Sequence, residues 1–453
     1  MSHRESSFAS IRWFGDIPSG WAIERLKQVT VSVTSGVSVN ATDSPAEEHQ
    51  QGVLKTSSVA GGRFLPTENK AVWESELERL ACPVTGDSVI MSRMNTPSLV
   101  GESGYVPESI PHLFLPDRLW KLTFNKTKVF TQFIATVLSS SGARQALSCM
   151  ATGTSPSMKN LSIEEMGNLP IPLPPIEIQK SIANYLKGET ARIDGLIAEK
   201  ERMLALLEEK RAALISRVVT RGLDPNAPLK PSGQEWLGDI PAHWRLERLK
   251  FHLFGVEQGW SPQCDNYLAE PDEWGVLKVG AVNSWTFNPS ENKRLPDDVE
   301  PFPEYEIKQR DVLMSRANTT QLLGSAVYVD EVSSKLLLCD KLYRLDVNDN
   351  QLDREFLVAY LRAQPGRFQL EREASGTSGS MQNIGQDTVQ NAWITIPPLN
   401  EQKSIARRIR ESRQDAEKMD SALRTSIGLL RERRAALITA AVTGQIPLEE
   451  MTG

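Results

Sequence analysis

Two long segments of the chain carry an apolar stripe with the spacing of a coiled coil. In residues 174–222 the apolar positions are separated alternately by three and four residues. This spacing is typical of the seam between paired helices, and a helix packed on a globular core would show a broader apolar face. About 45 residues at 1.5 Å each predict a rod of roughly 65 Å, too long for one element of a compact domain. The stripe consists of Ile182, Leu186, Ile193, Leu196, Met203, Leu204, Leu207, Leu214 and Val218.

The same pattern returns near the end of the chain. Pro174 and Pro397 each open such a segment, and the sequences QKSIA and RAALI follow at matching positions in both segments. An isolated helix with an apolar stripe is unstable in water, so each segment needs a partner. We expect the two segments to pair with each other in antiparallel orientation.

The sequence between the two segments is also duplicated, with the same shift as the one from Pro174 to Pro397. WxGDIPxxW opens at Trp13 and at Trp236, and GVLK, MSRxNT and GTSxSMxN follow in the same order in both halves. One constant shift over nearly the whole length indicates a tandem duplication of a globular unit followed by a rod, and not a solenoid of many repeats. The tryptophans that flank GDIP are interpreted as core residues around a tight turn.

The predicted fold class is α+β. We expect two tandem α/β globular domains, related by a pseudo-two-fold axis and separated by a pair of long antiparallel coiled-coil helices. The expected bounds are 1–170 for the first domain, 171–222 for the first helix, 223–235 for a Pro- and Gly-rich linker, 236–393 for the second domain and 394–453 for the second helix. Within the first domain, residues 53–55, 88–91 and 119–124 predict strands, and residues 130–139 predict a helix.

Composition narrows the class of protein. The net charge of −6 argues against a nonspecific polycation, although local basic patches can still bind nucleic acid. The four cysteines are scattered without a CxxC pair, which disfavours a zinc site or a disulfide framework and fits a reducing cytoplasm. No apolar run approaches the ~18–20 residues that cross a membrane, and the first residues lack the apolar core of a signal peptide.

Catalytic signals are weak. The chain contains no GxxxxGK[ST] and no GxGxxG after a predicted strand. Asp297, Glu306 and Lys308 have the spacing of a metal-dependent nuclease motif, but the pattern is short and Pro83 replaces the glutamate in the first half. A nuclease using these three residues is therefore kept only as a weak alternative, and no catalytic or metal-binding residue is assigned.

The shared motif MSRxNT carries residue types that bind DNA. Arg93 and Arg316 could hold phosphate or guanine, and Asn95 and Asn318 could read adenine. The alternative is that these residues only pack at the edge of a strand. Since both halves share the motif but differ elsewhere, phosphate or a common partner is a better match for it than base readout.

The second shared motif, GTSxSMxN, combines small residues with hydroxyl groups. Such hydroxyls suit phosphate or base edges, and an ordinary loop leading into the rod is the alternative. Lys159 in the first copy is replaced by Gln382 in the second, so this charge is not common to both units.

These motifs, each present twice and in the same order, resemble the specificity subunit of type I restriction–modification enzymes. The resemblance covers essentially the whole chain; the first copy departs from it at residues 176–182, IEIQKSI, where the second reads LNEQKSI. The resemblance implies two target recognition domains that read the halves of a bipartite, asymmetric sequence in double-stranded DNA. It also implies that the long helices bind two methyltransferase subunits, which carry S-adenosylmethionine and methylate adenine N6. A restriction subunit would join for cleavage, and this chain would be non-catalytic and without a cofactor of its own.

The candidate DNA-binding residues all lie in the shared motifs. They are Lys55, Arg93, Asn95, Thr96, Thr154, Ser155, Lys159, Lys278, Arg316, Asn318, Thr319, Thr377 and Ser378. Base readout is expected instead where the halves diverge, in residues 38–51 and 94–111 of the first unit and residues 261–274 and 317–334 of the second. A protein-binding coiled-coil scaffold without a DNA role is the main alternative.

Overall fold

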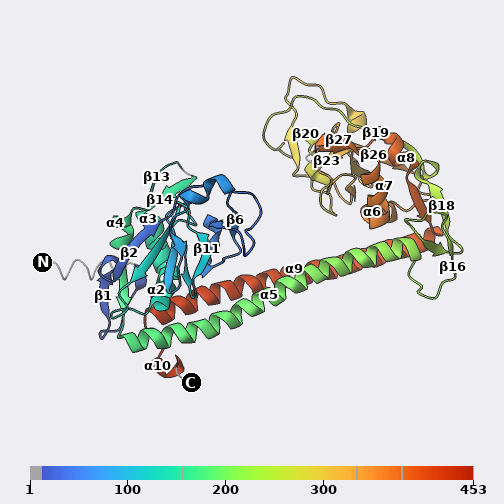
Figure 1. Cartoon of the computed structure of the whole chain (residues 1–453). Helices are drawn as coiled ribbons and strands as arrows, with labels where there is room; N and C mark the ends of the chain where they lie inside the picture. The colour runs from blue at the N-terminus through green and yellow to red at the C-terminus, as the bar shows by residue number, and fades with distance from the viewer. Residues whose placement is uncertain (1–12, 156, 333–334, 379–380, 452–453) are drawn as a thin grey trace. The chain divides into compact units, whose positions relative to one another are not determined.

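The chain folds into two compact units, each of which is described by itself. The computed structural model describes residues 13–155, 157–332, 335–378 and 381–451. One unit comprises residues 1–201 and 424–453, and the other comprises residues 202–423. Each unit therefore contains one globular domain together with part of both long helices (Figure 1).

The predicted pair of long helices is confirmed. Helix α5 spans Ile176–Arg221 and helix α9 spans Leu399–Val442, and in each unit the two lie side by side (Figure 1). In the first unit the beginning of α5 shares a core with the end of α9, and in the second unit the end of α5 shares a core with the beginning of α9. The helices are therefore antiparallel.

Burial along the predicted seam is uneven. Ile182, Leu186 and Ile193 are almost completely buried, but Leu196 and Met203 remain 44% and 47% exposed. Ile182 and Leu186 also belong to the core of the first globular domain, whereas two helices alone cannot enclose an apolar stripe on all sides. The helix pair consequently presents apolar side chains at its surface.

The first domain is built on a four-stranded antiparallel sheet in the order β10-β8-β12-β2. These strands span Ser103–Val106, Ser88–Ser92, Leu119–Phe124 and Thr30–Ser35. Helices α2 (Thr131–Ser139) and α3 (Ser141–Met150) supply Phe133, Ile134 and Leu147 to the core on one face of this sheet. A second sheet, β6-β3-β11-β7, encloses a smaller core around Leu54 and Leu113. Its strands span Asn69–Ala71, Gly52–Leu54, Ile110–Phe114 and Pro83–Val84.

The second domain repeats this construction in the second half of the chain. Its main sheet has the order β19-β26-β22-β24, and its smaller sheet has the order β21-β20-β25. The main strands span Leu253–Gln258, Leu342–Val347, Val312–Ser315 and Ala326–Tyr328, and the smaller ones span Asn292–Arg294, Trp274–Leu277 and Lys335–Leu337. Helices α6 (Arg354–Arg362) and α7 (Gln364–Arg372) take the places of α2 and α3.

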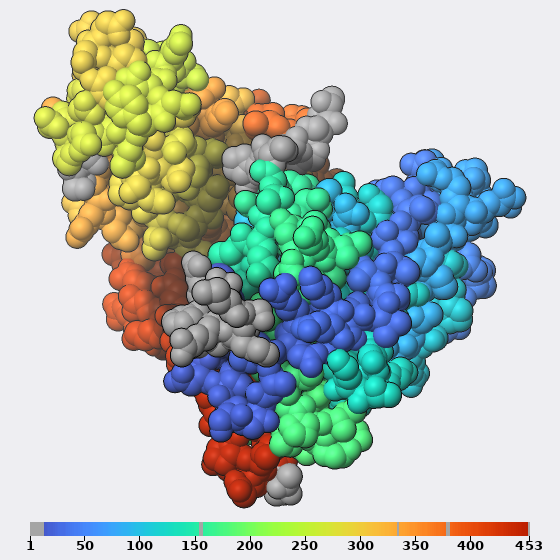
Figure 2. Space-filling model, turned by 90° about the vertical axis from the view of Figure 1, so that its left-hand side faces the viewer, coloured from blue at the N-terminus to red at the C-terminus, as the bar shows by residue number. Residues whose placement is uncertain are grey.

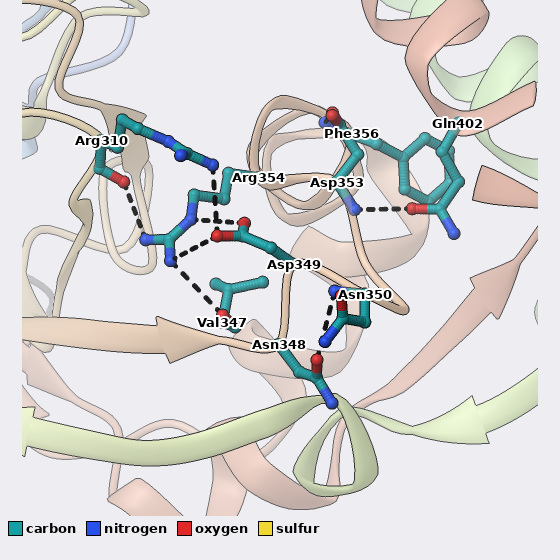
Figure 3. A network of polar contacts seen from close by, with 9 residues as sticks. All are labelled: Arg310, Val347, Asn348, Asp349, Asn350, Asp353, Arg354, Phe356 and Gln402. Carbon is teal, nitrogen blue, oxygen red and sulfur yellow. Dashed lines mark hydrogen bonds and ion pairs between the residues drawn. The ribbon is translucent and has the colours of Figure 1, made fainter. Parts of the chain in front are cut away.

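The glutamine of the repeated QKSIA motif attaches each domain to the beginning of its own long helix. Gln179 is completely buried, and its side-chain amide accepts from Phe130 N (2.8 Å) and donates to the carbonyl oxygens of Lys128 (3.1 Å) and Pro174 (2.8 Å). Gln402 makes the equivalent three bonds in the second unit, and Figure 3 shows its bond with Asp353 N (2.7 Å). Each glutamine thus satisfies main-chain groups that the junction would otherwise bury without partners.

Residues of the WxGDIPxxW motif pack against the glycine that follows a long helix in each unit. Gly444, just after α9, has a φ of +72° and leaves room for Trp21 and Pro18, which a Cβ atom would approach within 3.1 and 2.5 Å. Figure 2 shows the red end of the chain beside its dark-blue beginning on this unit. In the second unit Gly222 meets the buried Trp244 in the same way.

The departure of IEIQKSI from LNEQKSI has a structural counterpart here. Glu401 accepts a hydrogen bond from the indole N–H of Trp244 (3.1 Å) and contacts His243 Nε2 (2.9 Å). The equivalent residue in the first unit is Ile178, which packs on the apolar core together with Trp21. A polar contact in one unit is therefore replaced by apolar packing in the other.

Several shorter elements complete the two units. In the segment predicted as a linker, β16 (Leu229–Pro231) pairs with β17 (Asp239–Pro241), so part of it is ordered as a strand. The domains are joined to their helices by β1 (Ala22–Arg25) paired with β15 (Pro170–Leu173) and by β18 (Arg245–Arg248) paired with β29 (Trp393–Ile396). Among the described residues, none of the helices has the length and apolar character needed to span a bilayer.

Candidate nucleic-acid interface

The two shared motifs are distant in sequence but form one small sheet in each unit. In the first unit β9 (Met94–Asn95) pairs with β14 (Met158–Asn160), which pairs with β13 (Thr152–Ser155). In the second unit β23 (Ala317–Asn318), β28 (Met381–Asn383) and β27 (Ser375–Ser378) are arranged identically. MSRxNT and GTSxSMxN are therefore parts of a single surface feature, here called the motif sheet.

Glycine is required in the motif sheet because the hairpin is closely packed. A Cβ atom on Gly153 would lie 2.3 Å from the carbonyl oxygen of Met158, and one on Gly376 would lie 2.6 Å from that of Met381. Met158 and Met381 are themselves exposed by 40% and 44%. The hairpin thus presents an apolar side chain at an equivalent position in both units.

The two arginines of MSRxNT lie against aromatic rings. The Arg93 guanidinium is 5.6 Å from the ring centroid of Trp120, and the Arg316 guanidinium is 5.8 Å from that of the equivalent Tyr343. The Nε atom of each arginine is buried and has no hydrogen-bond partner within the described structure. This geometry favours the packing alternative, and contact of these arginines with DNA stays a prediction.

The asparagines of the motif shape the turn that follows. Asn95 Oδ1 accepts from Thr96 N at 2.9 Å, and Asn318 Oδ1 accepts from Thr319 N at the same distance. Asn318 is also largely buried and donates to Asn283 Oδ1 at 2.9 Å. Both threonines lie at exposed positions where the chain turns back. The asparagines therefore hold the turn, and the residues after them face solvent.

An arginine from the helices that cover the main sheet holds this turn in both units. The exposed residues at the turn, here called the tip, are 96–99 in the first unit and 319–321 in the second. Arg144 of α3 donates to the carbonyl oxygens of Val100 (2.8 Å) and Ser98 (3.0 Å), and burial lowers its pKa although the Glu102 carboxylate opposes this shift. Arg367 of α7 donates to the carbonyl oxygens of Leu323, the counterpart of Val100, and of Thr320 (2.9 Å), the counterpart of Pro97.

The tip therefore combines a fixed support with two positions that differ between the units, Pro97 against Thr320 and Ser98 against Gln321. Both arginines are present in the repeat, but sequence reasoning did not single them out. The sequence did contain a clue to them, because Arg144 and Arg367 occupy matched positions in stretches that otherwise differ between the two halves.

The candidate lysines are less distinctive. Lys55 lies 3.8 Å from Glu68 and Lys278 lies 3.3 Å from the equivalent Glu291, at partly exposed positions where such pairs contribute little. Lys159 is half-buried on β14 opposite Asn95. The side chains of Thr154, Ser155, Thr377 and Ser378 lie outside the described part of the structure.

Two exposed cations beside the motif sheet were missed by the sequence reasoning. Arg118 and Lys341 are equivalent, and their carbonyl oxygens accept from Arg93 N (3.0 Å) and Arg316 N (2.9 Å). Neither side chain forms an ion pair with any described residue. Exposed, unpaired cations at matched positions are suited to phosphate binding.

The nuclease-like residues are not arranged as a metal site. The Asp297 carboxylate accepts a hydrogen bond from Arg294 at 2.7 Å. The backbone of Glu306 forms a β-bridge with Leu337, and the equivalent residues of the first unit, Pro83 and Phe114, are paired in the same way. Within the part of the chain that the structure describes, no group of three His, Cys, Asp or Glu side chains could hold a metal ion.

Comparison with known proteins identifies the family. The model described as the type I restriction modification DNA specificity domain matches residues 53–201 and 276–418. The EcoKI specificity subunit of Escherichia coli (strain K12) is 21% identical over 442 residues, which cover 95% of this chain and 90% of that protein. The EcoEI specificity subunit of Escherichia coli is 28% identical over 228 residues, but these cover only 49% of this chain and 38% of that protein.

Solved structures show the same fold. A chain from a structure described as the basis of complex assembly and conformational transition of the type I R-M system aligns with a TM-score of 0.67 at 17% identity, covering 95% of this chain and 99% of that one. The HsdS subunit from Thermoanaerobacter tengcongensis aligns with a TM-score of 0.50 at 18% identity, covering 95% and 98%. The duplicated domains, the antiparallel helix pair and these matches agree, and the chain belongs to the family of type I restriction–modification specificity subunits (HsdS).

Proposed function

We propose that this chain is the non-catalytic, DNA-reading subunit of a type I restriction–modification complex. Each globular domain would recognise one half of a bipartite, asymmetric target in double-stranded DNA. The observation that carries this proposal is the tip at residues 96–99 and 319–321, which is exposed, differs between the units at Pro97/Thr320 and Ser98/Gln321, and is held by the shared Arg144 and Arg367. Binding loops are commonly built in this way, with variable residues on a rigid support.

Within each half-site, we assign different tasks to different residues. The tip residues that differ between the units would read base edges, while Arg118 and Lys341 beside the tip would hold phosphates and so position the domain on the duplex. The matched positions of these two cations fit a task that both half-sites require. In this assignment Arg93 and Arg316 support the surface by packing on Trp120 and Tyr343.

The helix pair would bind the catalytic partners. In the second unit a hollow of about 540 Å³ between α5 and α9 is lined by Leu207, Leu214, Ala416 and Met419, with Lys210, Arg211, Arg217 and Arg408 at its sides. Apolar side chains surrounded by charges are typical of protein interfaces. Two methyltransferase subunits, and a restriction subunit where one exists, are the proposed occupants.

The chemistry would then reside in the partners. S-adenosylmethionine would be bound by the methyltransferase subunits, which would methylate adenine N6 after taking the base out of the helix. This chain would hold the duplex during that step. A complex that acts on DNA in this way would work in the cytoplasm.

Exchange of the tip tests the function directly. Residues 96–98 would be replaced by residues 319–321 of the second tip, which changes Pro97→Thr and Ser98→Gln, and the chain would be purified with its methyltransferase partner. The expected result is a changed base preference in one half-site with the other half-site unaltered, measured by mapping methylated adenines. Unchanged preference in both half-sites would contradict the assignment of the tip, and a chain that binds its partner but no DNA would support a protein scaffold instead.

A further inference from the structure

The turn at residues 61–62 and its repeat counterpart at residues 284–285 connect each domain to the helix pair. In the first unit Gly62 has a φ of +75°, and a Cβ atom there would meet the Cβ of Ser139 at 2.7 Å. In the second unit the two equivalent positions hold Trp285 and Arg362, whose guanidinium lies 4.9 Å from the ring centroid of Trp285. A tight glycine–serine contact is thus replaced by a large stacked pair, and the two positions touch in both units.

In the first unit the connection to the helices is ionic. Asp194 of α5 lies between two arginines, with Arg434 Nε of α9 at 3.0 Å and Arg63 Nη1 of the domain at 3.5 Å. Arg434 also donates to the carbonyl oxygen of Gly61 at 3.4 Å. The Arg63 side chain is 57% exposed, so its attraction to Asp194 is open to screening by salt.

In the second unit the contact at the matching position is a stack. Trp285 lies between Arg362 of α6 and Arg413 of α9, whose guanidinium is 4.7 Å from the ring centroid. Arg362 also donates to the carbonyl oxygens of Ser284 (2.8 Å) and Asn283 (2.7 Å), which fixes the turn that carries the tryptophan. A cation over an aromatic face is strengthened when solvent is excluded, and the Arg413 side chain is only 15% exposed.

The ionic partners of the first unit are absent or redirected in the second. Thr286 stands in place of Arg63, and Arg211, the counterpart of Arg434, pairs with Glu208 on its own helix at 2.7 Å. Glu417, the counterpart of Asp194, is bound by Arg413 at 3.1 Å on its own helix. At the position where two ion pairs hold the first domain, the second domain therefore uses Trp285, and an ion pair between Arg410 of α9 and Glu355 of α6 lies beside it.

We infer that Trp285 is a positioning residue that fixes the second recognition domain on the helix pair by a salt-resistant stack, whereas Asp194 fixes the first domain by a salt-sensitive ionic contact. What this attachment of the second domain means for DNA recognition rests on the proposed function. A domain that pivots on the helices would accept half-sites at more than one separation, because its own base contacts would be unchanged. Loss of Trp285 should therefore relax the required spacing and leave the recognised bases as they are.

The domain attachment can be measured without DNA. Pairs of spin labels, attached through an unnatural amino acid in the full chain, would report distances between Asp346 and Lys418 in the second unit and between Glu108 and Glu432 in the first. We expect Trp285→Ala to broaden the first of these distributions at any salt concentration. We expect the second to broaden in the Asp194→Asn variant, and in the unaltered protein between about 0.05 M and about 1 M NaCl.

Trp274→Ala is the matched control. Trp274 is also half-buried and lies 5.9 Å from a cation, Lys335, but it belongs to the small core of the domain and not to the helix contact. An unchanged distribution in Trp285→Ala, or equal broadening in Trp274→Ala, would overturn the positioning role. Equal salt sensitivity in the two units would overturn the chemical distinction between them.

The second experiment measures DNA selection. It uses the chain with its methyltransferase partner and a library of DNA duplexes in which the two half-sites are fixed and their separation varies. For Trp285→Ala we expect at least a tenfold loss of preference for the natural separation, with the same bases selected. An unaltered spacing preference would overturn the consequence for DNA. If the unaltered complex selects no DNA at all, the proposed function fails, while the label distances still decide the role of Trp285.

Discussion

The side-chain oxygen of Gln402 accepts a 2.7 Å hydrogen bond from the backbone N–H of Asp353, and Gln179 and Phe130 form the same bond in the first unit. Both glutamines are completely buried and each also donates to two carbonyl oxygens. Asp353 in turn is the N-cap of α6, accepting from Phe356 N at 3.0 Å (Figure 3). One residue at the beginning of a long helix therefore fixes the start of a helix in the globular domain.

Replacing Gln402 by Ala should destabilise the second unit by about 3 kcal/mol, because three main-chain groups lose their partner in a buried site. Gln414→Ala is the control, since Gln414 lies on the same helix without such buried partners. Urea unfolding followed by circular dichroism measures the difference. Equal stability of the two variants would show that water replaces the lost bonds.

Removing Arg118 or Lys341 should weaken DNA binding without altering the sequence preference. If each cation holds one phosphate, each change to Ala should reduce the slope of log affinity against log salt by about 0.9. Lys418→Ala serves as the control, because Lys418 is an exposed lysine of α9. Fluorescence anisotropy over a series of salt concentrations gives the slopes. An unchanged slope in Arg118→Ala and Lys341→Ala would exclude both residues from phosphate contact.

The motif sheet should not tolerate a side chain at Gly376. Gly376→Ala places a Cβ atom 2.6 Å from the Met381 carbonyl oxygen, so the hairpin must shift. We expect a loss of about 1–3 kcal/mol in stability together with weaker DNA binding. Gly255→Ala on β19 is the matched control, since a Cβ atom there meets nothing within 4 Å. Thermal unfolding of both variants decides, and equal melting temperatures would contradict the close packing.

The cysteines should differ sharply in reactivity. Burial raises the pKa of Cys339 to about 12, whereas Cys149 lies at an exposed position. At pH 8 a thiol reagent should therefore modify Cys149 quickly and leave Cys339 unreacted until the second unit unfolds. Because the folded-state pKa is raised, the buried neutral thiol contributes stability below about pH 8.5, and this contribution is lost as pH rises toward 12. Mass spectrometry after timed labelling tests this, and rapid native labelling of Cys339 would contradict it.

Periodicity predicted the long helices well because the apolar stripe is a local property of the sequence. The observed α5 begins at Ile176 and ends at Arg221, close to the proline and glycine boundaries expected for it. The strands predicted at residues 53–55, 88–91 and 119–124 are likewise found, as β3, β8 and β12, since their short apolar runs are also a local property. The exposed middle of the seam, at Leu196 and Met203, did not follow from periodicity, because it depends on what else covers the helices.

The arrangement of the candidate site could not be predicted in the same way. The pairing of Lys159 with Asn95 joins strands distant in sequence through main-chain bonds, which leave no pattern in the side chains. The type of residue at Arg93 could not distinguish phosphate contact from stacking on Trp120. Gln179 was recognised as part of a repeated motif, but its function became visible only with its buried main-chain partners in place.

The bonds of Gln402 reach only main-chain atoms, at Asp353, Gln351 and Pro397. Every folded domain offers such atoms whatever its side chains are, so this attachment places little demand on the sequence of the domain that it holds. Recombination between genes could therefore exchange one reading module for another and still yield a chain that assembles. A new DNA preference would then arise by exchange of a whole recognition domain, while the long helices that hold it stay the same.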